Sequence, residues 1–321
     1  MLDIPDGLGR LGYGAASLGN LFHEMSDQDA ATIVDQAWDG GVRYFDTAPH
    51  YGLGLSEHRL GAALARRPRE EYLLSTKVGR LLEPTPQNAD RIDDQGFVVP
   101  SAYRRVWDPS PAAVRRSLLE SMERIGTDRI DIAYLHDPDE YDLTGGIAIG
   151  MPALAEAKEA GLVRAIGIGS KSVTALAAAI RTGLCDLIMV AGRLTVLDRT
   201  GAELLDLCQR FDVGIVNVGV FNSGALAAPE PSPDLHFEYV PITLERLAEL
   251  EQVHKVCTKF GARVADVALQ HSFRMPQVVN VTVGASTAGQ IRRSLDGMTT
   301  AIDPDLWPAL DAVAERWSPA T

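Results

Sequence analysis

The feature that most constrains the fold is a regular alternation of short apolar runs with longer segments of helical periodicity. The short runs have the length and composition of buried β-strands. Eight such runs are present, and they begin near Leu11, Val42, Tyr72, Ile130, Val163, Cys185, Val213 and Val278. Because strands that alternate with helices form parallel sheets, this pattern predicts a (β/α)8 TIM barrel that occupies residues 1–321 as a single domain.

The segments between the strands carry recognisable helix ends. Asp27–Trp38 follows Ser26, whose hydroxyl can cap a helix, and it is followed by Gly40 and Gly41, which can end one. The other predicted helices are Ser56–Ala65, Pro111–Ile125, Pro152–Ala160, Val173–Arg181, Gly201–Phe211, Thr243–Phe260, Val264–Phe273, Ala288–Leu295 and Pro304–Arg316. We expect the last of these to pack outside the barrel.

Two connections are much longer than the others. Arg80–Ser110, after the third strand, is rich in Pro, Asp and Arg and is predicted to be a long loop on the catalytic face. It is a candidate substrate lid, in which Tyr103 and Trp107 are candidate substrate contacts. The second long connection lies between the last two strands and begins with Phe221–Tyr239, which is predicted to be loop.

The charge balance narrows the choice of partner. Lys and Arg number 30 against 43 Asp and Glu, so the net charge is −13, and no basic cluster offsets it. Such a surface repels nucleic acid and anionic membranes, and we therefore expect a small-molecule substrate. No apolar run approaches the ~18 residues of a membrane span. The absence of a signal-peptide core and of any C-x-x-C motif predicts a cytoplasmic protein with reduced thiols.

Four residues stand at the C-terminal ends of predicted strands or just beyond them, namely Asp46, Tyr51, Lys77 and His136. Singly they have ordinary structural roles, but in a parallel barrel these strand ends meet on one face. A tyrosine hydroxyl, with a pKa near ~10, is a poor base until a neighbouring ammonium lowers that pKa. Lys77 can supply this charge, Asp46 can hold Lys77, and His136 can orient a substrate oxygen. The set predicts proton transfer coupled to hydride transfer.

The segments around these residues resemble those of the aldo-keto reductases. The stretch G-V-R-Y-F-D-T-A-P-H-Y-G-L-G-L-S-E-H-R-L-G is similar to the family signature, and L-L-S-T-K and D-R-I-D-I-A-Y-L-H-D are similar to its Lys and His segments. The resemblance extends over nearly the whole chain. It implies that Asp46, Tyr51, Lys77 and His136 form the catalytic tetrad, with Tyr51 as acid and base. It also implies an extended nicotinamide cofactor across the barrel mouth, and no G-x-G-x-x-G turn follows a strand.

The loops after the seventh and eighth strands are the predicted cofactor site, because barrels often bind phosphate there. Both loops offer small residues and backbone N–H groups near a helix start, as an anion requires. On spacing alone, two ordinary strand-to-helix turns remain the alternative. With the resemblance added, the predicted cofactor contacts are Ser170, Arg193, Phe221, Asn222, Ser223, Gly224, Leu226, Gly284, Ala285, Ser286 and Gln290.

Departures from the common family pattern favour NAD over NADP. NADP-preferring members carry a Lys and an Arg where this chain has Gly284 and Gln290, and those cations hold the 2′-phosphate. Arg292 and Arg293 lie close by and are the residues that could bind NADP instead. Other departures are found at Gly169, Ala191 and Val218.

These departures, together with the A-G-R and F-N-S-G motifs, resemble one branch of the family. It contains NAD-dependent D-threo-aldose (L-fucose, L-galactose) 1-dehydrogenases and pyridoxal 4-dehydrogenase. The resemblance implies oxidation of an aldose hemiacetal to its lactone, or alternatively of pyridoxal to 4-pyridoxolactone, and a monomeric protein. A nicotinamide-binding regulatory barrel without turnover is a third possibility. A metal-dependent hydrolase requires clustered ligands, which the histidines do not provide, so no metal is predicted.

Overall fold

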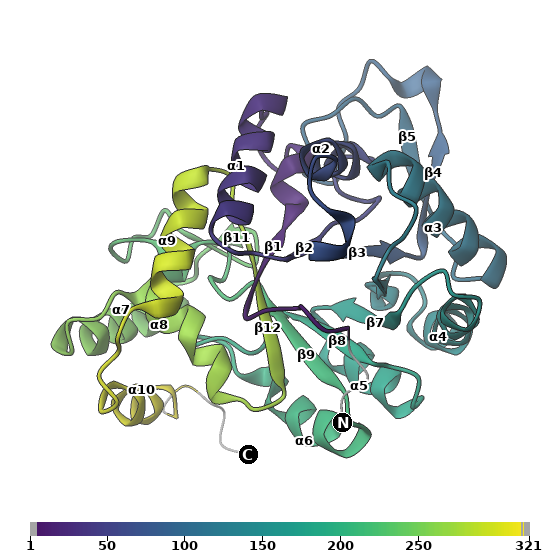
Figure 1. Cartoon of the computed structure of the whole chain (residues 1–321). Coiled ribbons are helices and arrows are strands. Elements are labelled where there is room, and N and C mark those ends of the chain that lie inside the picture. Colours follow the sequence, from purple (N-terminus) through teal and green to yellow (C-terminus); the bar gives the residue numbers. More distant parts are fainter. Residues whose placement is uncertain (1–4, 316, 318–321) are drawn as a thin grey trace.

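The computed structural model describes residues 5–315 and 317, and within them eight parallel strands close into a barrel (Figure 1). The strands are β1 (Leu11–Gly14), β2 (Tyr44–Asp46), β3 (Leu73–Val78), β6 (Ile132–His136), β7 (Ala165–Ser170), β8 (Leu187–Ala191), β9 (Gly214–Val218) and β12 (Val278–Gly284). They follow one another around the barrel in chain order, and β1 pairs with both β2 and β12. All eight predicted strands and the predicted (β/α)8 barrel are confirmed.

Helices surround the barrel on its outside (Figure 1). They are α1 (Asp27–Asp39), α2 (Leu55–Leu64), α3 (Pro111–Ile125), α4 (Leu143–Glu159), α5 (Val173–Arg181), α6 (Glu203–Phe211), α7 (Leu244–Lys259), α8 (Val264–His271), α9 (Ala288–Thr299) and α10 (Leu306–Ala314). Ser26 caps α1 by accepting a hydrogen bond from the Asp29 N–H, as predicted. Of the predicted last helix, Arg316 lies outside the described residues. The described part of this helix, α10, packs through Leu306 and Leu310 into an apolar cluster shared with α7.

One helix is longer than the sequence pattern predicted. α4 begins at Leu143, whereas the prediction placed its start at Pro152. The side chain of Asp142 caps it by accepting a hydrogen bond of 3.0 Å from the Gly145 N–H. Pro152 therefore lies inside the helix, where it removes one backbone hydrogen bond. The first turns escaped prediction because they are rich in glycine, which has a weak helix preference.

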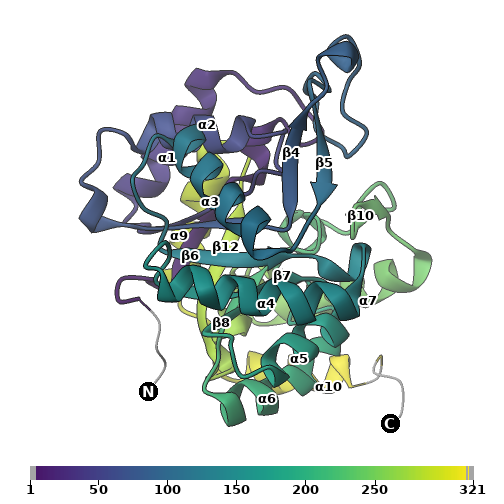
Figure 2. The ribbon, with the colours of Figure 1, turned by 90° about the vertical axis from the view of Figure 1, so that its right-hand side faces the viewer.

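The segment Arg80–Ser110 is not the irregular loop that was predicted. It contains two antiparallel strands, β4 (Arg80–Pro84) and β5 (Tyr103–Trp107), which pair along their whole length. Figure 2 shows this ladder extending away from the body of the barrel. The strand β5 reads Y-R-R-V-W and is only partly buried, so it lacks the apolar run by which the barrel strands were recognised. We call the whole segment 80–110 the β4–β5 insertion.

The second long connection also carries structure of its own. Between β9 and α7 it forms a short two-stranded ladder, β10 (His236–Phe237) with β11 (Val240–Pro241). Elsewhere, the three cysteines are buried, and none is disulfide-bonded within the described part of the chain. No helix of the described residues is long and apolar enough to cross a membrane.

Candidate functional site

The C-terminal ends of β2 and β3 bring together a buried ion pair. The Lys77 ammonium donates to Asp46 Oδ2 at 2.6 Å and to the Thr47 carbonyl at 3.0 Å. The Ser75 hydroxyl donates to the other carboxylate oxygen, Asp46 Oδ1, at 2.7 Å. Burial lowers the pKa of Lys77, but Asp46 and Tyr51 raise it by more, so this pKa lies above its usual value. The pair is therefore charged, with both carboxylate oxygens satisfied, as a buried pair requires.

Tyr51 is positioned over this pair by a tight turn after β2. Gly52 adopts a left-handed φ of +62°, and a Cβ there would lie 2.3 Å from the Gly19 carbonyl oxygen, so the turn requires glycine. The Lys77 Nζ atom lies 4.7 Å from the centroid of the Tyr51 ring. Burial raises the pKa of Tyr51 and Lys77 lowers it, with a net rise. Lys77 thus lowers this pKa, as predicted, but the opposing effect of burial is larger.

His136 ends β6, which pairs with β3, and its ring lies beside Tyr51. The two ring centroids are 5.9 Å apart and the rings are perpendicular. Burial, with the charges of Arg80 and Lys77, lowers the pKa of His136 well below its usual value. The imidazole is thus neutral and can donate one hydrogen bond. The four residues predicted to be catalytic therefore come together on one face of the barrel.

Three residues that the sequence did not single out complete this part of the rim, namely His50, Arg80 and Asp137. The Arg80 side chain is 4% exposed and contacts Asp137 Oδ2 at 2.8 Å and Glu140 Oε2 at 2.9 Å. Its other terminal nitrogen lies 3.3 Å from His50 Nδ1. Asp137 Oδ2 in turn lies 3.4 Å from His136 Nε2. The sequence could have pointed to one of the three residues, because Asp137 directly follows His136 at the end of a predicted strand.

His50 joins the turn after β2, which carries Tyr51 and is called the catalytic turn below for its proposed role, to the β4–β5 insertion. Its ring packs edge-on against Phe97, with centroids 5.3 Å apart. Arg105 donates to the His50 carbonyl at 2.9 Å and pairs with both carboxylate oxygens of Asp93 at 2.6 and 3.0 Å. Burial, assisted by the charges of Arg80 and Arg105, lowers the pKa of His50 to about 2. The insertion is therefore fixed against the catalytic turn by a neutral imidazole and buried arginines.

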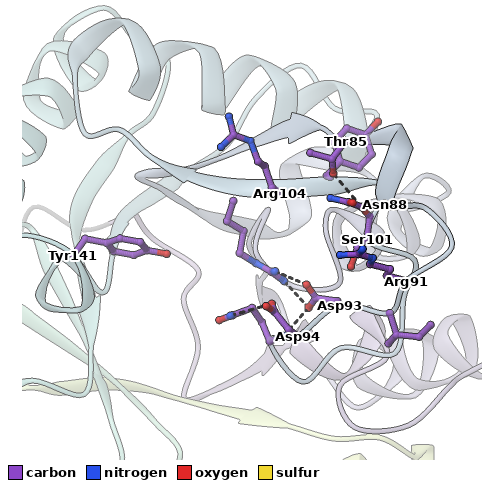
Figure 3. Close-up of a pocket in the computed structure, with 12 residues that line it drawn as sticks. Thr85, Asn88, Arg91, Asp93, Asp94, Ser101, Arg104 and Tyr141 are labelled. Carbon is purple, nitrogen blue, oxygen red and sulfur yellow. Dashed lines mark hydrogen bonds and ion pairs between the residues drawn. The ribbon is translucent and has the colours of Figure 1, made fainter.

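A polar pocket of about 480 Å³ lies within the β4–β5 insertion, and Tyr141 from the segment after β6 completes its wall. Its wall includes Tyr103, Arg104 and Arg105 from the insertion and Tyr141 from the opposite side (Figure 3). Of the two predicted substrate contacts, Tyr103 borders this pocket. Trp107 does not line it, but its ring stacks on Tyr141 with centroids 4.8 Å apart. None of the four predicted catalytic residues lines this pocket, so the role of the insertion as a substrate lid stays a prediction.

The residues predicted to bind the cofactor lie along the other half of the rim. Phe221, Asn222, Ser223 and Gly224 form the turn after β9, and Gly284, Ala285 and Ser286 lead from β12 toward α9. Asn222 is 3% exposed, and its side chain lies beside Gly192. Neither its amide nitrogen nor its amide oxygen has a hydrogen-bond partner among the described residues. Because an unpartnered buried amide is costly, this turn fits a ligand that offers both a donor and an acceptor.

The start of α9 is already satisfied by its own side chains. Thr287 and Gln290 form a capping box, in which the Thr287 hydroxyl accepts from the Gln290 N–H. The Gln290 side-chain oxygen accepts from the Ser286 N–H at 2.7 Å and from the Thr287 N–H at 3.2 Å. Arg292 is directed away toward α1, where it donates to the Gln36 side chain at 2.8 Å. The Gln290 side chain therefore occupies the backbone N–H groups at the helix start that a phosphate would require.

Three of the predicted cofactor contacts are engaged within the protein. The Ser170 hydroxyl donates to an Asp139 carboxylate oxygen at 2.7 Å. Arg193 forms ion pairs with Asp198 and Glu238. Leu226 is fully buried in an apolar cluster, and its N–H donates to the Phe221 carbonyl at 3.1 Å. Among the described residues, no group of three His, Cys, Asp or Glu side chains is arranged to hold a metal ion.

An eight-stranded barrel that gathers Asp, Tyr, Lys and His at the carboxyl ends of its strands is the architecture of a barrel oxidoreductase. The family model described as the aldo/keto reductase family matches residues 10–315. The chain belongs to this family, and the resemblance predicted from the sequence is confirmed.

Relatives of known name agree with this assignment. The chain is 45% identical over 303 residues to a D-threo-aldose 1-dehydrogenase from a Pseudomonas species, covering 94% of this chain and 92% of that protein. It is 34% identical over 321 residues to the pyridoxal 4-dehydrogenase of Microbacterium luteolum, covering 94% and 92%. Among solved structures, an aldo-keto reductase from Bacillus halodurans in its holo form matches with a TM-score of 0.74 at 26% identity, covering 96% and 92%.

Proposed function

We propose that this oxidoreductase is an NAD-dependent aldose 1-dehydrogenase, which oxidises the hemiacetal carbon of a D-threo-type aldose such as L-fucose to the lactone. The observation that carries the reaction is the charged Asp46–Lys77 pair, with Tyr51 over Lys77 and the neutral His136 beside it. The substrate class is supported by the 45% identity to a D-threo-aldose 1-dehydrogenase.

The oxidation removes two electrons and two hydrogens from the sugar. Bound NAD supplies the hydride acceptor. The C1–H bond breaks and its electron pair leaves with the hydrogen, while the electrons of the C1 hydroxyl O–H bond form the lactone carbonyl. Tyr51 takes the hydroxyl proton, and His136 donates its N–H to the same oxygen. Lys77 stabilises the tyrosinate that accepts the proton, and Asp46 holds Lys77 in place.

A preference for NAD rather than NADP is supported by the start of α9. The position where a 2′-phosphate requires a cation is Gly284, and Gln290 already occupies the N–H groups of Ser286 and Thr287. The unpartnered amide of Asn222 matches a cofactor group that can both donate and accept. We therefore propose that the turn after β9 and the start of α9 hold the cofactor.

The test is a turnover screen of purified protein with NAD or NADP against a panel of aldoses and pyridoxal, followed by the absorbance of reduced nicotinamide. We expect NAD reduction with L-fucose. Its rate should rise toward alkaline pH, because burial raises the pKa of Tyr51 and the base form is scarce at neutral pH. Turnover of pyridoxal but of no aldose would transfer the assignment to pyridoxal 4-dehydrogenation. Nicotinamide binding without turnover of either would favour a regulatory barrel.

The cofactor preference has a test of its own in Gly284→Lys. A lysine here supplies the missing cation, so the ratio of kcat/KM with NADP to that with NAD should rise roughly 10-fold or more, as for a hydrogen bond to a charged group. Arg292→Lys serves as the control, because this side chain is directed toward α1 and should leave the ratio unchanged. A wild-type protein that already prefers NADP would contradict the proposal.

A further inference from the structure

Asp137 is a carboxylate at the edge of the catalytic group to which the proton transfer assigns no role. It adopts a left-handed φ of +42°, and its N–H donates to the Gly169 carbonyl at 3.0 Å. This conformation directs the carboxylate back over the end of β6, where Oδ2 lies 3.4 Å from His136 Nε2. Aspartate and asparagine tolerate left-handed backbone better than most residues, so the position selects a short side chain with a polar end.

Arg80 fixes this carboxylate in place. Its guanidinium contacts Asp137 Oδ2 at 2.8 Å and is almost fully buried, with His50 and Glu140 as its other partners. The Asp137 side chain nevertheless remains 20% exposed. A carboxylate that is fixed on one side and open on the other can accept further hydrogen bonds, because ionised oxygens have several acceptor positions.

The reacting oxygen of a substrate has to lie within hydrogen-bonding distance of His136 Nε2, the nitrogen that Asp137 Oδ2 approaches to 3.4 Å. A hydroxyl on the next carbon of the substrate then falls beside the Asp137 carboxylate. We propose that Asp137, held by Arg80, accepts a hydrogen bond from the hydroxyl on the carbon adjacent to the hemiacetal carbon, and so selects an aldose. This inference rests on the proposed function and names the residue that determines its specificity.

The two candidate substrates differ at this position. In an aldose, the carbon next to the hemiacetal carbon bears a hydroxyl. In the hemiacetal of pyridoxal, that carbon belongs to the aromatic ring and bears none. A site built to hydrogen-bond a hydroxyl rejects an analogue that lacks it, because the polar group of the protein loses its partner. Asp137 therefore favours the aldose.

The experiment compares L-fucose with 2-deoxy-L-fucose in the wild type, in Asp137→Asn and in Glu140→Gln. Removing the hydroxyl should lower the wild-type kcat/KM roughly 10- to 100-fold, as expected for a hydrogen bond to a charged group. In Asp137→Asn the ratio of kcat/KM for L-fucose to that for 2-deoxy-L-fucose should shrink to roughly a few-fold, because the carboxylate that binds the hydroxyl is gone. Glu140→Gln should keep the wild-type ratio, because Glu140 shares Arg80 with Asp137 but forms no ion pair with His136 among the described residues, and its side chain is 46% exposed. Comparing ratios cancels the intrinsic difference in reactivity between the sugars.

Asparagine suits the left-handed backbone, and thermal unfolding of each variant checks that the folded protein is measured. A wild type that oxidises L-fucose and an Asp137→Asn variant that keeps the full wild-type ratio would overturn this inference and leave the proposed function standing. Equal wild-type kcat/KM values for the two sugars would also overturn this inference and leave the proposed function standing. A wild type that oxidises no aldose would overturn both.

Discussion

Two buried carboxylates lie at opposite ends of the two barrel strands that flank β3, and they have different partners. Asp46 ends β2 and is 3% exposed, whereas Asp131 immediately precedes β6 and is 1% exposed. Asp131 accepts hydrogen bonds from the Leu74 N–H at 2.9 Å and from Arg69 at 2.6 Å, and Arg164 lies at 3.4 Å. It thereby ties together the starts of β3, β6 and β7.

The partners, rather than the carboxylates, distinguish the two sites. Asp131 is bound by a backbone N–H and by guanidinium groups, which stay charged at every accessible pH. Asp46 holds Lys77, an amine whose charge also acts on the Tyr51 ring at 4.7 Å. The N-terminal end of the barrel therefore uses its buried carboxylate to join strands, and the C-terminal end holds the residues to which the proposed function assigns proton transfer, in keeping with the general division in such barrels.

The largest expected effect is that of Tyr51→Phe at the C-terminal end. The variant deletes the proton carrier and leaves the ring over Lys77, so turnover should fall about 10³-fold. The free energy of unfolding should change by less than about 0.5 kcal/mol, since Lys77 is the one hydrogen-bond partner of this hydroxyl among the described residues. Initial rates and urea unfolding measure the two quantities. Turnover within tenfold of the wild type would exclude Tyr51 as the acid and base.

Asp131→Asn at the N-terminal end should give the opposite profile. The amide can still accept from the Leu74 N–H, but Arg69 loses its buried counter-charge, so the free energy of unfolding should fall by about 3 kcal/mol. The kcat of the folded protein should be unchanged. Glu83→Gln, which breaks an exposed pair with Arg116, is the matched control and should cost at most about 1 kcal/mol. Equal losses of unfolding free energy in Asp131→Asn and Glu83→Gln would contradict the structural role of Asp131.

Buried imidazoles should make stability fall at acid pH. Burial lowers the pKa of His50 to about 2, that of His271 to about 3, and that of His136 well below its usual value. These groups stay neutral in the fold while the unfolded chain binds protons below pH ~6.5, so stability falls by about 1.4 kcal/mol per pH unit for each. Asp137 acts in the opposite direction, because burial raises its pKa to about 6 and the fold takes up its proton first.

Urea unfolding between pH 6.5 and 4.5 measures this slope. His271→Asn, which lies on α8 outside the catalytic group, should flatten the slope by the share of one histidine and leave neutral-pH activity unchanged. A wild-type stability that is constant over this range would contradict the expected loss.

The barrel could be predicted from the sequence because its strands are buried and therefore apolar. The β4–β5 insertion could not, because β5 owes its conformation to pairing with β4, as with Leu82↔Arg105, rather than to an apolar pattern. The start of α4 was hidden for a related reason, since its glycines disfavour a helix that tertiary packing nevertheless forms.

The clustering of Asp46, Tyr51, Lys77 and His136 was predictable because each stands at or near a strand end, a position that sequence patterns locate well. The contact between Arg80 and Asp137 was not predictable, because it joins residues that are 57 positions apart and lie on separate elements. The lowering of the Tyr51 pKa by Lys77 was predictable, but the larger rise caused by burial was not, because the sequence names the neighbouring charge and gives no measure of burial. The NAD preference stays a prediction.

The smallest expected effect lies between the two ends, at Ser75 in the middle of β3. Its hydroxyl donates to Asp46 Oδ1 at 2.7 Å and also contacts the Tyr44 hydroxyl at 2.9 Å. Ser75→Ala should therefore cost about 1 kcal/mol of stability. It should also shift the alkaline rise in turnover to higher pH, because a less neutralised Asp46 raises the pKa of Tyr51 further.

Thr76→Val is the matched control for Ser75→Ala. Thr76 is the next residue of β3, on its other face, and its hydroxyl donates to Glu57 on α2 at 2.9 Å. We expect a similar loss of stability with no shift in the pH profile. If both variants shift the profile, strand position rather than contact with Asp46 is responsible. If only Ser75→Ala shifts the pH profile, residues that affect proton transfer and residues that affect stability alone lie on opposite faces of β3. The same separation would then hold within one strand and between the two ends of the barrel.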